Sequence, residues 1–555
     1  MKPLVNFAGW PFGLPYWPLH ALFGDVGGWN AFVLLCYVLA GSVACGWLRA
    51  LGLPLGGALA GGLAFALAPY RVDQSVGHML GPVSMLLPLA LLGLERGRRG
   101  SAWWLVLAAA ATASIPLSGQ AHLALGTTPF VLGYALVRLR ERRAWVAAVA
   151  GAAAAAGAGL LYQRLIVVGS IDAHGRSLAE VASYSAQWRD FLARSERHGS
   201  ESFVLLGWAT PLAALVGAGL LARARSWRLL ALLGIAVVVP CLLALGTNLP
   251  LYSELYHHLP PLRYPRVPER LMPIACLGIA GLVAVAVARL RHAALVALAL
   301  VALAADLHFG AYVATAAGPG QSAYAALASQ PHGRLLELPV FLPDNNFGSA
   351  YLYYDMAAQR ERPEGYALGP NETDALARRL RPLNCGDWTE GDLLFHDGVH
   401  FVAVHDGLYA IGSRGEWFAW RALEQHGYGP IAQTGAVTVF GRGGTLAVPG
   451  PAEPPRDQVV VCDGWRIQHG NVLGITPGEL WVYGAGAFRL PLRAAGDAHA
   501  LVSVDGRRTA QLRSTGVVTL RLRGARWHLV RVDQRGRGTL TLGSRSLSPP
   551  VPVRA

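Results

Sequence analysis

Long apolar runs occupy most of the first 310 residues of this 555-residue chain. A helix needs roughly 20 apolar residues to cross a lipid bilayer, and ten runs reach or approach that length. They lie at about 30–48, 54–69, 79–94, 102–117, 122–137, 144–163, 203–222, 228–246, 270–288 and 293–310. The pattern predicts a polytopic α-helical transmembrane domain over 30–310 with about ten spans. The run at 79–94 is short and contains two prolines, and 144–163 is mostly Ala and Gly, so either could be buried within the bundle.

The pattern changes on both sides of this domain. Residues 1–29 are rich in Pro, Gly and Trp and lack the basic start and apolar core of a signal peptide, so they predict an interfacial loop. Residues 320–447 mix strand and helix patterns and predict a small α/β domain. Residues 455–555 alternate in short strands between turn residues, which predicts a β-sandwich. The proline-rich stretch 449–457 is the expected linker.

Composition agrees with a membrane protein. The chain is 53% hydrophobic and 14% charged, whereas about a quarter of the residues of a soluble protein are charged. The formal net charge of +14 would suggest nucleic acid in a soluble protein, but much of the arginine lies in short loops between apolar runs. The charge therefore reports membrane topology, and no nucleic-acid partner is expected.

The arginines alternate between loops and predict an orientation. One set of short loops carries them, at residues 49, 96–99, 138–143, 223–228 and 289–291. By the positive-inside rule these loops are cytoplasmic. The other set must then lie outside, at 70–81, 118–122, 164–202 and 246–270. The same argument places 1–29, the α/β domain and the β-sandwich outside the cytoplasm.

One outer segment, Tyr256–Leu282, combines three arginines with a high density of proline. Proline prevents a helix before about residue 268, so Arg263, Arg266 and Arg270 are expected on an irregular, stiff stretch at the membrane surface. Three guanidinium groups there would form a site for an anion, and the phosphate of a lipid is the obvious candidate. The alternative is that the arginines reach toward lipid headgroups and anchor a helix end.

Two other outer loops carry polar residues close to the membrane. The first contains Arg71, Asp73 and His78, and the second contains Gln120 and His122. Ionisable groups at this depth are costly and indicate a polar cavity. The alternative for the first loop is that it caps its helices, with Asp73 pairing with Arg71. A third loop is predicted to form one amphipathic interfacial helix over 178–192.

Motifs for other functions are missing from the sequence. No phosphate-binding loop, no G-x-S-x-G motif and no zinc-type spacing of Cys and His is found, so nucleotide-dependent and serine-nucleophile enzymes are unsupported. A Cys385–Cys462 disulfide is possible if the C-terminal region is extracytoplasmic. Exposed aromatic side chains of the sandwich, such as Trp465, Trp481 and Tyr483, could stack on sugar rings, which would make it a carbohydrate-binding domain. Core packing is the alternative use.

Several segments together resemble the GT-C superfamily of integral-membrane glycosyltransferases. They are WPFGLPYWPLHALFGDVGGWNAFVLL, APYRVDQSVGHML, YSAQWRDFLARSERHGSESFVLLGW and LPPLRYPRVPERLMP, followed by GVHFVAVH and the sandwich. The resemblance implies that the chain transfers a sugar from a polyprenyl-phosphate carrier to an extracytoplasmic glycan or lipid acceptor in the cell envelope. The implied partners are the lipid-linked sugar, membrane lipid and the glycan acceptor, and a divalent cation stays open as a cofactor.

The resemblance also implies roles for individual residues. In an inverting transfer, a carboxylate deprotonates the acceptor hydroxyl while cations stabilise the departing lipid phosphate. Arg263, Arg266 and Arg270 would take the phosphate, with Arg71 and His78 in support. Gln120 and His122 are further substrate-binding candidates. Asp73 is the remaining candidate for the base.

One departure from the superfamily concerns the catalytic acid. The superfamily carries this acid in the first outer loop, after a first transmembrane helix, whereas this chain begins inside what resembles the second half of that loop. Either the first transmembrane helix is missing or the protein is not catalytic in that way. The competing function is a non-catalytic membrane protein that binds or helps move lipid-linked glycans.

Overall fold

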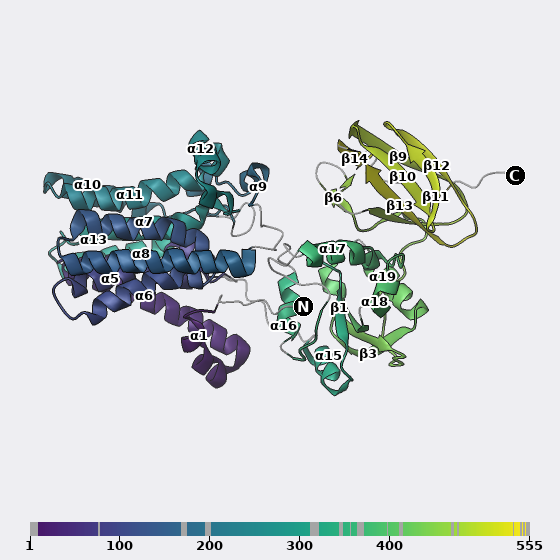
Figure 1. Cartoon of the computed structure of the whole chain (residues 1–555), viewed down its shortest axis with the longest axis horizontal. Coiled ribbons are helices and arrows are strands. Elements are labelled where there is room, and N and C mark those ends of the chain that lie inside the picture. Colours follow the sequence, from purple (N-terminus) through teal and green to yellow (C-terminus); the bar gives the residue numbers. More distant parts are fainter. Residues whose placement is uncertain are drawn as a thin grey trace. The chain divides into compact units, whose positions relative to one another are not determined.

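A computed structural model gives the fold of the chain as two compact units (Figure 1). The units are Met1–Val168 with Asp172–Ala316, and Ala317–Ala555 with Gly169–Ile171. The structure describes residues 9–75, 78–167, 175–194, 201–310, 321–342, 348–355, 357–362, 371–396, 398–409, 414–467, 471–473, 477–536, 538–543, 547 and 550. The first eight residues of the predicted N-terminal loop, and 168–174 and 195–200 of the long outer loop, lie outside the described residues.

The first unit is a helical bundle, and the ten apolar runs correspond to its helices. Nine runs match one helix each, and 79–94 is divided between α4 and α5. The helices are α1 Gly13–Ala50, α2 Leu55–Ala66, α3 Pro69–Asp73, α4 Leu80–Val83, α5 Leu86–Gly97, α6 Trp103–Leu117, α7 Ala121–Arg138, α8 Arg142–Tyr162, α9 Leu178–Ser183, α10 Ala209–Arg223, α11 Trp227–Ala244, α12 Pro250–His258, α13 Met272–Val287 and α14 Ala293–Leu307.

Several of these helices can cross a membrane. Within the described ranges, four are long and apolar enough, namely Val26–Ala50, Arg142–Leu165, Trp227–Ala244 and Pro268–Val287. Four shorter apolar helices are α2, α6, α10 and α14. The chain is therefore a membrane protein with several spanning helices, and the full number of ten stays a prediction.

Helix α13 lies at the centre of the bundle, packed against α2, α10 and α11. Small residues allow α2 to approach it closely. A Cβ on Gly57 would lie 2.5 Å from the carbonyl oxygen of Ala284, and one on Gly61 would lie 2.6 Å from that of Ala280. Close approach of backbones through small residues is typical of membrane helix pairs. The approach fixes α13, whose first turn follows the arginine segment.

The predicted N-terminal loop is wrong for residues 13–29. Helix α1 begins at Gly13 and continues to Ala50, with a kink where Gly24 has φ +69°. Pro15 lies in the first helical turn, where its missing N–H would have no partner in any case, so it does not prevent the helix. Gly24 tolerates the left-handed conformation, which allows the helix to change direction before the membrane-spanning part.

The predicted amphipathic helix over 178–192 is also wrong as one element. The structure has α9, Leu178–Ser183, and then a separate 3-10 turn, Trp188–Phe191. The Ser185 hydroxyl donates to the carbonyl oxygen of Val181 at 2.8 Å and accepts from the backbone N–H of Thr247 at 3.1 Å. This contact to a distant loop ends the helix. Trp188 and Leu192 remain exposed, as an interfacial segment requires.

One end of the bundle carries a buried ionic network. Glu95 accepts from the hydroxyl of Tyr134 at 2.7 Å and from Arg138 at 2.8 Å, and Arg98 lies 3.0 Å away. This is the end to which the sequence assigns the cytoplasmic arginine loops. A cavity of about 460 Å³ opens beside it, lined by Arg49, Ala50, Glu95, Arg96, Arg99 and Gly100.

The outer loops predicted from the sequence meet one another. The N–H of Tyr70 donates to the carbonyl of Leu205 at 3.3 Å, and the N–H of Arg176 donates to that of Arg263 at 2.7 Å. A third bond of 3.0 Å joins Ala186 to Ala244. Backbone bonds between segments far apart in sequence hold this end of the bundle together, and the arginine segment is part of it.

The second unit begins with an α/β domain, as predicted. Its sheet has the order β1-β2-β4-β3, with β1 parallel to β2 and the other pairs antiparallel. The strands are β1 Arg334–Leu338, β2 Val399–His405, β3 Tyr428–Thr434 and β4 Val437–Arg442. The helices are α15 Gln321–Ala325, α16 Ser349–Asp355, α17 Asn371–Leu380, α18 Asp392–His396 and α19 Gly415–Gln425.

A buried polar network lies at the carboxyl ends of β1 and β2. Glu337 Oε1 accepts from Arg362 Nε at 2.8 Å. Its Oε2 accepts from the hydroxyl of Tyr324, and His405 Nε2 lies 3.0 Å from the same oxygen. Because each group has a partner, the network stabilises the sheet instead of leaving an unpaired charge in the core.

The C-terminal domain is a β-sandwich of two five-stranded sheets, with orders β11-β10-β13-β8-β5 and β12-β9-β14-β7-β6. Its strands are β5 Val460–Val461, β6 Trp465–Ile467, β7 Asn471–Leu473, β8 Gly478–Tyr483, β9 Gly486–Gly496, β10 His499–Val504, β11 Arg507–Leu512, β12 Gly516–Leu522, β13 Trp527–Arg535 and β14 Gly538–Leu542. The alternation predicted most of these strands. It missed β7, which is only three residues long, and β11, whose two core-packed apolar residues, Ala510 and Leu512, are only partly buried.

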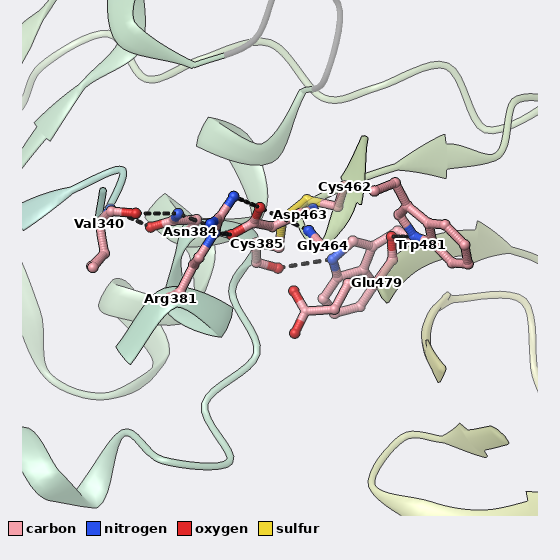
Figure 2. Close-up of a disulfide and its surroundings, with 10 residues drawn as sticks. Val340, Arg381, Asn384, Cys385, Cys462, Asp463, Gly464, Glu479 and Trp481 are labelled. Atoms are coloured by element: carbon pink, nitrogen blue, oxygen red, sulfur yellow. Dashed lines mark hydrogen bonds and ion pairs between the residues drawn. A yellow bond between two sulfur atoms is a disulfide. The ribbon is translucent and has the colours of Figure 1, made fainter. Parts of the chain in front are cut away.

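A covalent joint connects the sandwich to the α/β domain. Figure 2 shows the Cys385–Cys462 disulfide beside a bidentate pair in which Arg381 contacts Asp463 at 2.6 and 2.8 Å. The indole of Trp481 donates to the carbonyl of Cys385 at 2.8 Å. The disulfide that the sequence left open is therefore present, and the two domains form one unit.

The aromatic side chains proposed for sugar stacking are used in packing. Trp481 stacks on Phe418 of the α/β domain, with ring centroids 4.4 Å apart and planes at 5°. Trp465 packs against the sandwich core, and its indole donates to the carbonyl of Glu479 at 3.2 Å. Tyr483 lies against Trp527 at 5.5 Å. These contacts favour core packing over sugar binding for Trp465 and Trp481.

Glu479, on β8 beside the joint, is expected to make stability depend on pH. Burial raises the pKa of this carboxyl well above 4.5, and the nearby Asp387 and Asp463 raise it further. A raised folded-state pKa stabilises the fold below about pH 4.5, and this contribution is lost as pH rises through the folded-state value. Glu479→Gln should therefore raise the stability of this unit at neutral pH and flatten its pH profile.

Thermal unfolding of the full chain between about pH 4 and about pH 8, followed by tryptophan fluorescence, measures this effect. The exposed Glu424 provides the matched control, because Glu424→Gln should leave the profile of the wild type unchanged. A Glu479→Gln profile parallel to that of the wild type would show that the pKa of Glu479 is the same in the folded and unfolded states.

Candidate functional site

The candidate site is built on the irregular stretch Leu259–Leu271, between α12 and α13. Four of its thirteen residues are prolines, and it forms only two 3-10 turns, Pro260–Arg263 and Pro268–Leu271. Prolines lack the N–H that an α-helix needs and restrict the preceding residue. The predicted irregular segment ahead of an apolar helix is present over 259–271, whereas Tyr256–His258 belong to α12.

Two guanidinium groups of this stretch converge on one carboxylate oxygen. Arg266 donates from Nη2 to Glu201 Oε1 at 2.8 Å, and Arg270 donates from Nη2 to the same atom at 3.3 Å. The side chains of Arg266, Arg270 and Glu201 are 18%, 22% and 10% exposed. Arg266 also lies over the ring of Tyr184, 4.8 Å from its centroid. The contacts hold both cations in a fixed position facing one anion.

A second carboxylate lies next to this pair. Glu269 is fully buried, and its electrostatic neighbours include Arg270 and Glu201. The backbone N–H of Ser202 is near it, yet neither carboxylate oxygen makes a hydrogen bond of normal geometry within the described residues. An acid in such surroundings is costly to ionise. The site therefore combines two paired cations with an acid that lacks a partner of its own.

Arg71 lies apart from this arrangement. It is fully buried, and its guanidinium donates to the Ser84 hydroxyl at 2.6 Å and to the carbonyl oxygens of Phe65, Ala66 and Gly81 at 2.8–2.9 Å. Within the described residues, the guanidinium thus donates to the ends of α2 and α4 and not to Asp73. This geometry favours a structural role for Arg71, holding the first outer loop against the bundle.

Arg263 also spends its donors on the backbone. Its Nε and Nη2 donate to the carbonyl oxygens of Tyr256 and His257 at 3.2 and 2.8 Å, at the end of α12. Cations at the last turn of a helix stabilise its free carbonyl groups. Of the three arginines that the sequence grouped together, Arg266 and Arg270 form the pair, and Arg263 caps a helix beside it.

The remaining predicted residues differ in their relation to the Arg266–Arg270 pair. Asp73 is buried at the end of α3 and accepts from the amide of Gln74 at 3.2 Å. His78 lies 3.0 Å from the same Gln74 through Nδ1. His78 and His122 both have Arg266 and Arg270 among their electrostatic neighbours. Gln120 is the residue that precedes α7, on which His122 occupies the first turn.

Sequence reasoning missed the acidic half of the site. Glu201 lies 65 residues before Arg266, in a loop that was considered only for its amphipathic helix. Glu269 stands between prolines and arginines in a segment analysed for its cations. The sequence signal that could have identified both acids is their position in loops close to the membrane, where a charged group needs a partner of opposite charge. Among the described residues, no cluster of three His, Cys, Asp or Glu side chains could hold a metal ion.

Comparison with known proteins identifies the fold. No protein-family model and no curated protein matches the chain. Among solved structures, the cryo-EM structure of the arabinofuranosyltransferase AftD from mycobacteria matches 95% of this chain with a TM-score of 0.52 and 16% identity. The match covers 53% of AftD, so the chain spans about half the length of that protein. At this identity the likeness shows the fold alone.

A weaker match is the crystal structure of ArnT from Cupriavidus metallidurans bound to undecaprenyl phosphate. It has a TM-score of 0.33 and 12% identity, and the match covers 79% of this chain and 88% of ArnT.

Proposed function

From the GT-C fold that this chain shares with a mycobacterial arabinofuranosyltransferase, we propose that it is a membrane glycosyltransferase. It would take a sugar from a polyprenyl-phosphate carrier and transfer it to a glycan or lipid acceptor outside the cytoplasm. The observation that carries the proposal is the convergence of Arg266 and Arg270 on a single anion position beside the first turn of α13. Fixed guanidinium pairs suit phosphate because they offer parallel donors to its oxygens.

The proposed chemistry assigns the departing lipid phosphate to Arg266 and Arg270. As the bond from sugar to phosphate breaks, negative charge grows on the phosphate oxygens, and preorganised cations stabilise it. His78 and His122, close to the same arginines, would contact the substrate. Asp73 remains the proposed base, because it is the acid of the predicted outer loop 70–81, at the end of α3. Arg71, Arg263 and Gln120 would shape the site around these groups.

The proposed orientation places the site and the second unit outside the cytoplasm, in a cell membrane. The alternation of arginine loops supports it, and so does the Cys385–Cys462 disulfide, because disulfides persist in oxidising compartments. A glycan acceptor would then be reached by the side of the protein that carries the α/β domain and the sandwich.

The alternative is a protein that binds lipid-linked glycans without transferring them. The burial of Asp73, with 1% of its surface exposed, favours this alternative, because a base must reach the acceptor hydroxyl. Both functions use the same phosphate site, and they differ only in whether the sugar leaves its carrier.

Release of polyprenyl phosphate from polyprenyl-phosphate-linked sugars in proteoliposomes distinguishes the two functions. We expect the full chain to release it in the presence of an acceptor glycan, and the Arg266→Ala/Arg270→Ala double variant to lose at least 90% of the rate, on the order of the effect of losing charge-assisted contacts. Arg228→Ala is the control and should retain activity. Arg228 lies in the first turn of α11, whereas the arginine segment follows the other end of that helix. Binding without release would favour the non-catalytic alternative.

A further inference from the structure

Glu201 already holds the position that a phosphate would take. Both Arg266 and Arg270 donate from Nη2 to one oxygen of its carboxylate, at 2.8 and 3.3 Å. A lipid phosphate oxygen bound between the same two guanidinium groups would lie where Glu201 Oε1 lies now. The carboxylate and the phosphate cannot occupy that position together.

We propose that Glu201 is an internal competitor, which a lipid phosphate displaces on binding and which returns to the arginines when the phosphate leaves. The inference rests on the proposed function, because it assumes that Arg266 and Arg270 form the phosphate site. It adds a regulatory role for an acid that the transfer chemistry does not use.

Charge balance supports an exchange of this kind. Arg266 and Arg270 are mostly buried, and removing their anion without replacement would leave two cations unpaired in a poorly solvated region. A sugar linked through a phosphodiester carries one negative charge, the same as the carboxylate of Glu201. Exchanging one anion for the other keeps the net charge of the site unchanged. Both guanidinium groups then contact an anion in either bound form, and neither form has an uncompensated buried cation.

The backbone next to Glu201 also favours a segment with two conformations. Ser202 has φ +92°, a conformation that residues with a side chain rarely adopt. Its hydroxyl is buried and has no hydrogen-bond partner within the described residues. Strain of this type persists where surrounding contacts impose it, and it is common at ligand clamps and switches. The ion pairs of Glu201 are such contacts, so their loss to a phosphate would allow the backbone to relax.

The competition also has a consequence for turnover. After transfer, the lipid product is a phosphate monoester, which carries more negative charge than the phosphodiester donor and would bind two arginines more tightly. A tethered carboxylate at the same site opposes this, because it acts at a high effective concentration. Glu201 would thus limit product retention.

Binding of farnesyl phosphate to the purified full chain in detergent tests the proposal. We expect Glu201→Gln to bind it about ten- to a hundredfold more tightly than the wild type, because the competing charge-assisted contacts are removed. Glu254→Gln is the matched control. Glu254 is exposed on α12 and lies 3.6 Å from His258, so the loss of its charge should leave the affinity unchanged. Inorganic phosphate, tested in parallel, should bind far more weakly if the site takes a lipid, and equally well if it takes free phosphate.

Two results separate failure of this inference from failure of the proposed function. If the wild type binds farnesyl phosphate, and Arg266→Ala weakens it, but Glu201→Gln binds equally or more weakly, the competitor role is wrong and the phosphate site stands. If neither the wild type nor Glu201→Gln binds, both are wrong. Should Glu201→Gln fail to fold, Glu201→Asp provides the test. Its shorter side chain keeps the charge but reaches the arginines less well, so binding should still tighten, and unchanged or weaker binding would overturn the inference.

Discussion

Replacing Arg266 or Arg270 with alanine is expected to weaken the binding of a polyprenyl phosphate about ten- to a hundredfold. Each guanidinium would make charge-assisted hydrogen bonds to the phosphate, worth about 1.5–3 kcal/mol. Lysine should rescue binding only in part, since it keeps the charge but loses the planar pair of donors. The measurement is the affinity of a polyprenyl-phosphate analogue for purified variants whose folding matches that of the wild type.

Two further variants make this experiment decisive. Arg263→Ala should have a smaller effect, because Arg263 donates to backbone carbonyl oxygens of α12. Arg228→Ala should have none. If the arginines only anchor a helix end in the headgroup region, lysine should serve as well as arginine, and alanine should lower expression without changing affinity. Unchanged affinity in both Arg266→Ala and Arg270→Ala would contradict the phosphate site.

The membrane helices could be predicted from the sequence because their signal is local. An apolar run of sufficient length has few alternatives to a helix in a bilayer, and all ten runs correspond to helices. The same holds for the sandwich, where alternation over a few residues marks a strand. The errors came where local signals were ambiguous. Pro15 suggested a loop but lies in the first turn of α1, where proline is tolerated, and β11 has only Ala510 and Leu512 packed against the core.

The candidate site could be predicted only in part, because its geometry depends on distant contacts. The density of proline and arginine identified the segment, and it identified Arg266 and Arg270 as candidate phosphate ligands. Their partner Glu201 comes from another loop, and no local pattern connects the two. Arg71 and Arg263 look equivalent to the pair in sequence. They differ in structure because backbone carbonyl groups lie within their reach and take up their donors.

Removing the Cys385–Cys462 disulfide is expected to have the largest effect on stability. The bond closes a loop with a sequence separation of 77 residues, and loop-closure entropy assigns about 4 kcal/mol to such a crosslink. In the Cys385→Ala/Cys462→Ala variant, Arg381–Asp463 and Trp481–Phe418 contacts remain but must hold the joint without the covalent bond. We expect β8 to lose much of its protection against hydrogen exchange in the full chain.

Reduction of the Cys385–Cys462 disulfide provides the internal control for this prediction. The redox state of the disulfide in cells also tests on which side of the membrane the second unit lies. A reductant should lower the protection of β8 in the wild type and leave the double variant unchanged, while Cys241→Ala, which removes an unbonded thiol of the bundle, should behave as the wild type. Equal protection in the wild type and the double variant would show that non-covalent contacts suffice. Recovery of the disulfide intact from cells would place the joint in an oxidising compartment, because cytoplasmic thiols are kept reduced. The orientation on which the phosphate site depends would then rest on chemistry independent of the arginine loops, and a fully reduced pair would argue against it.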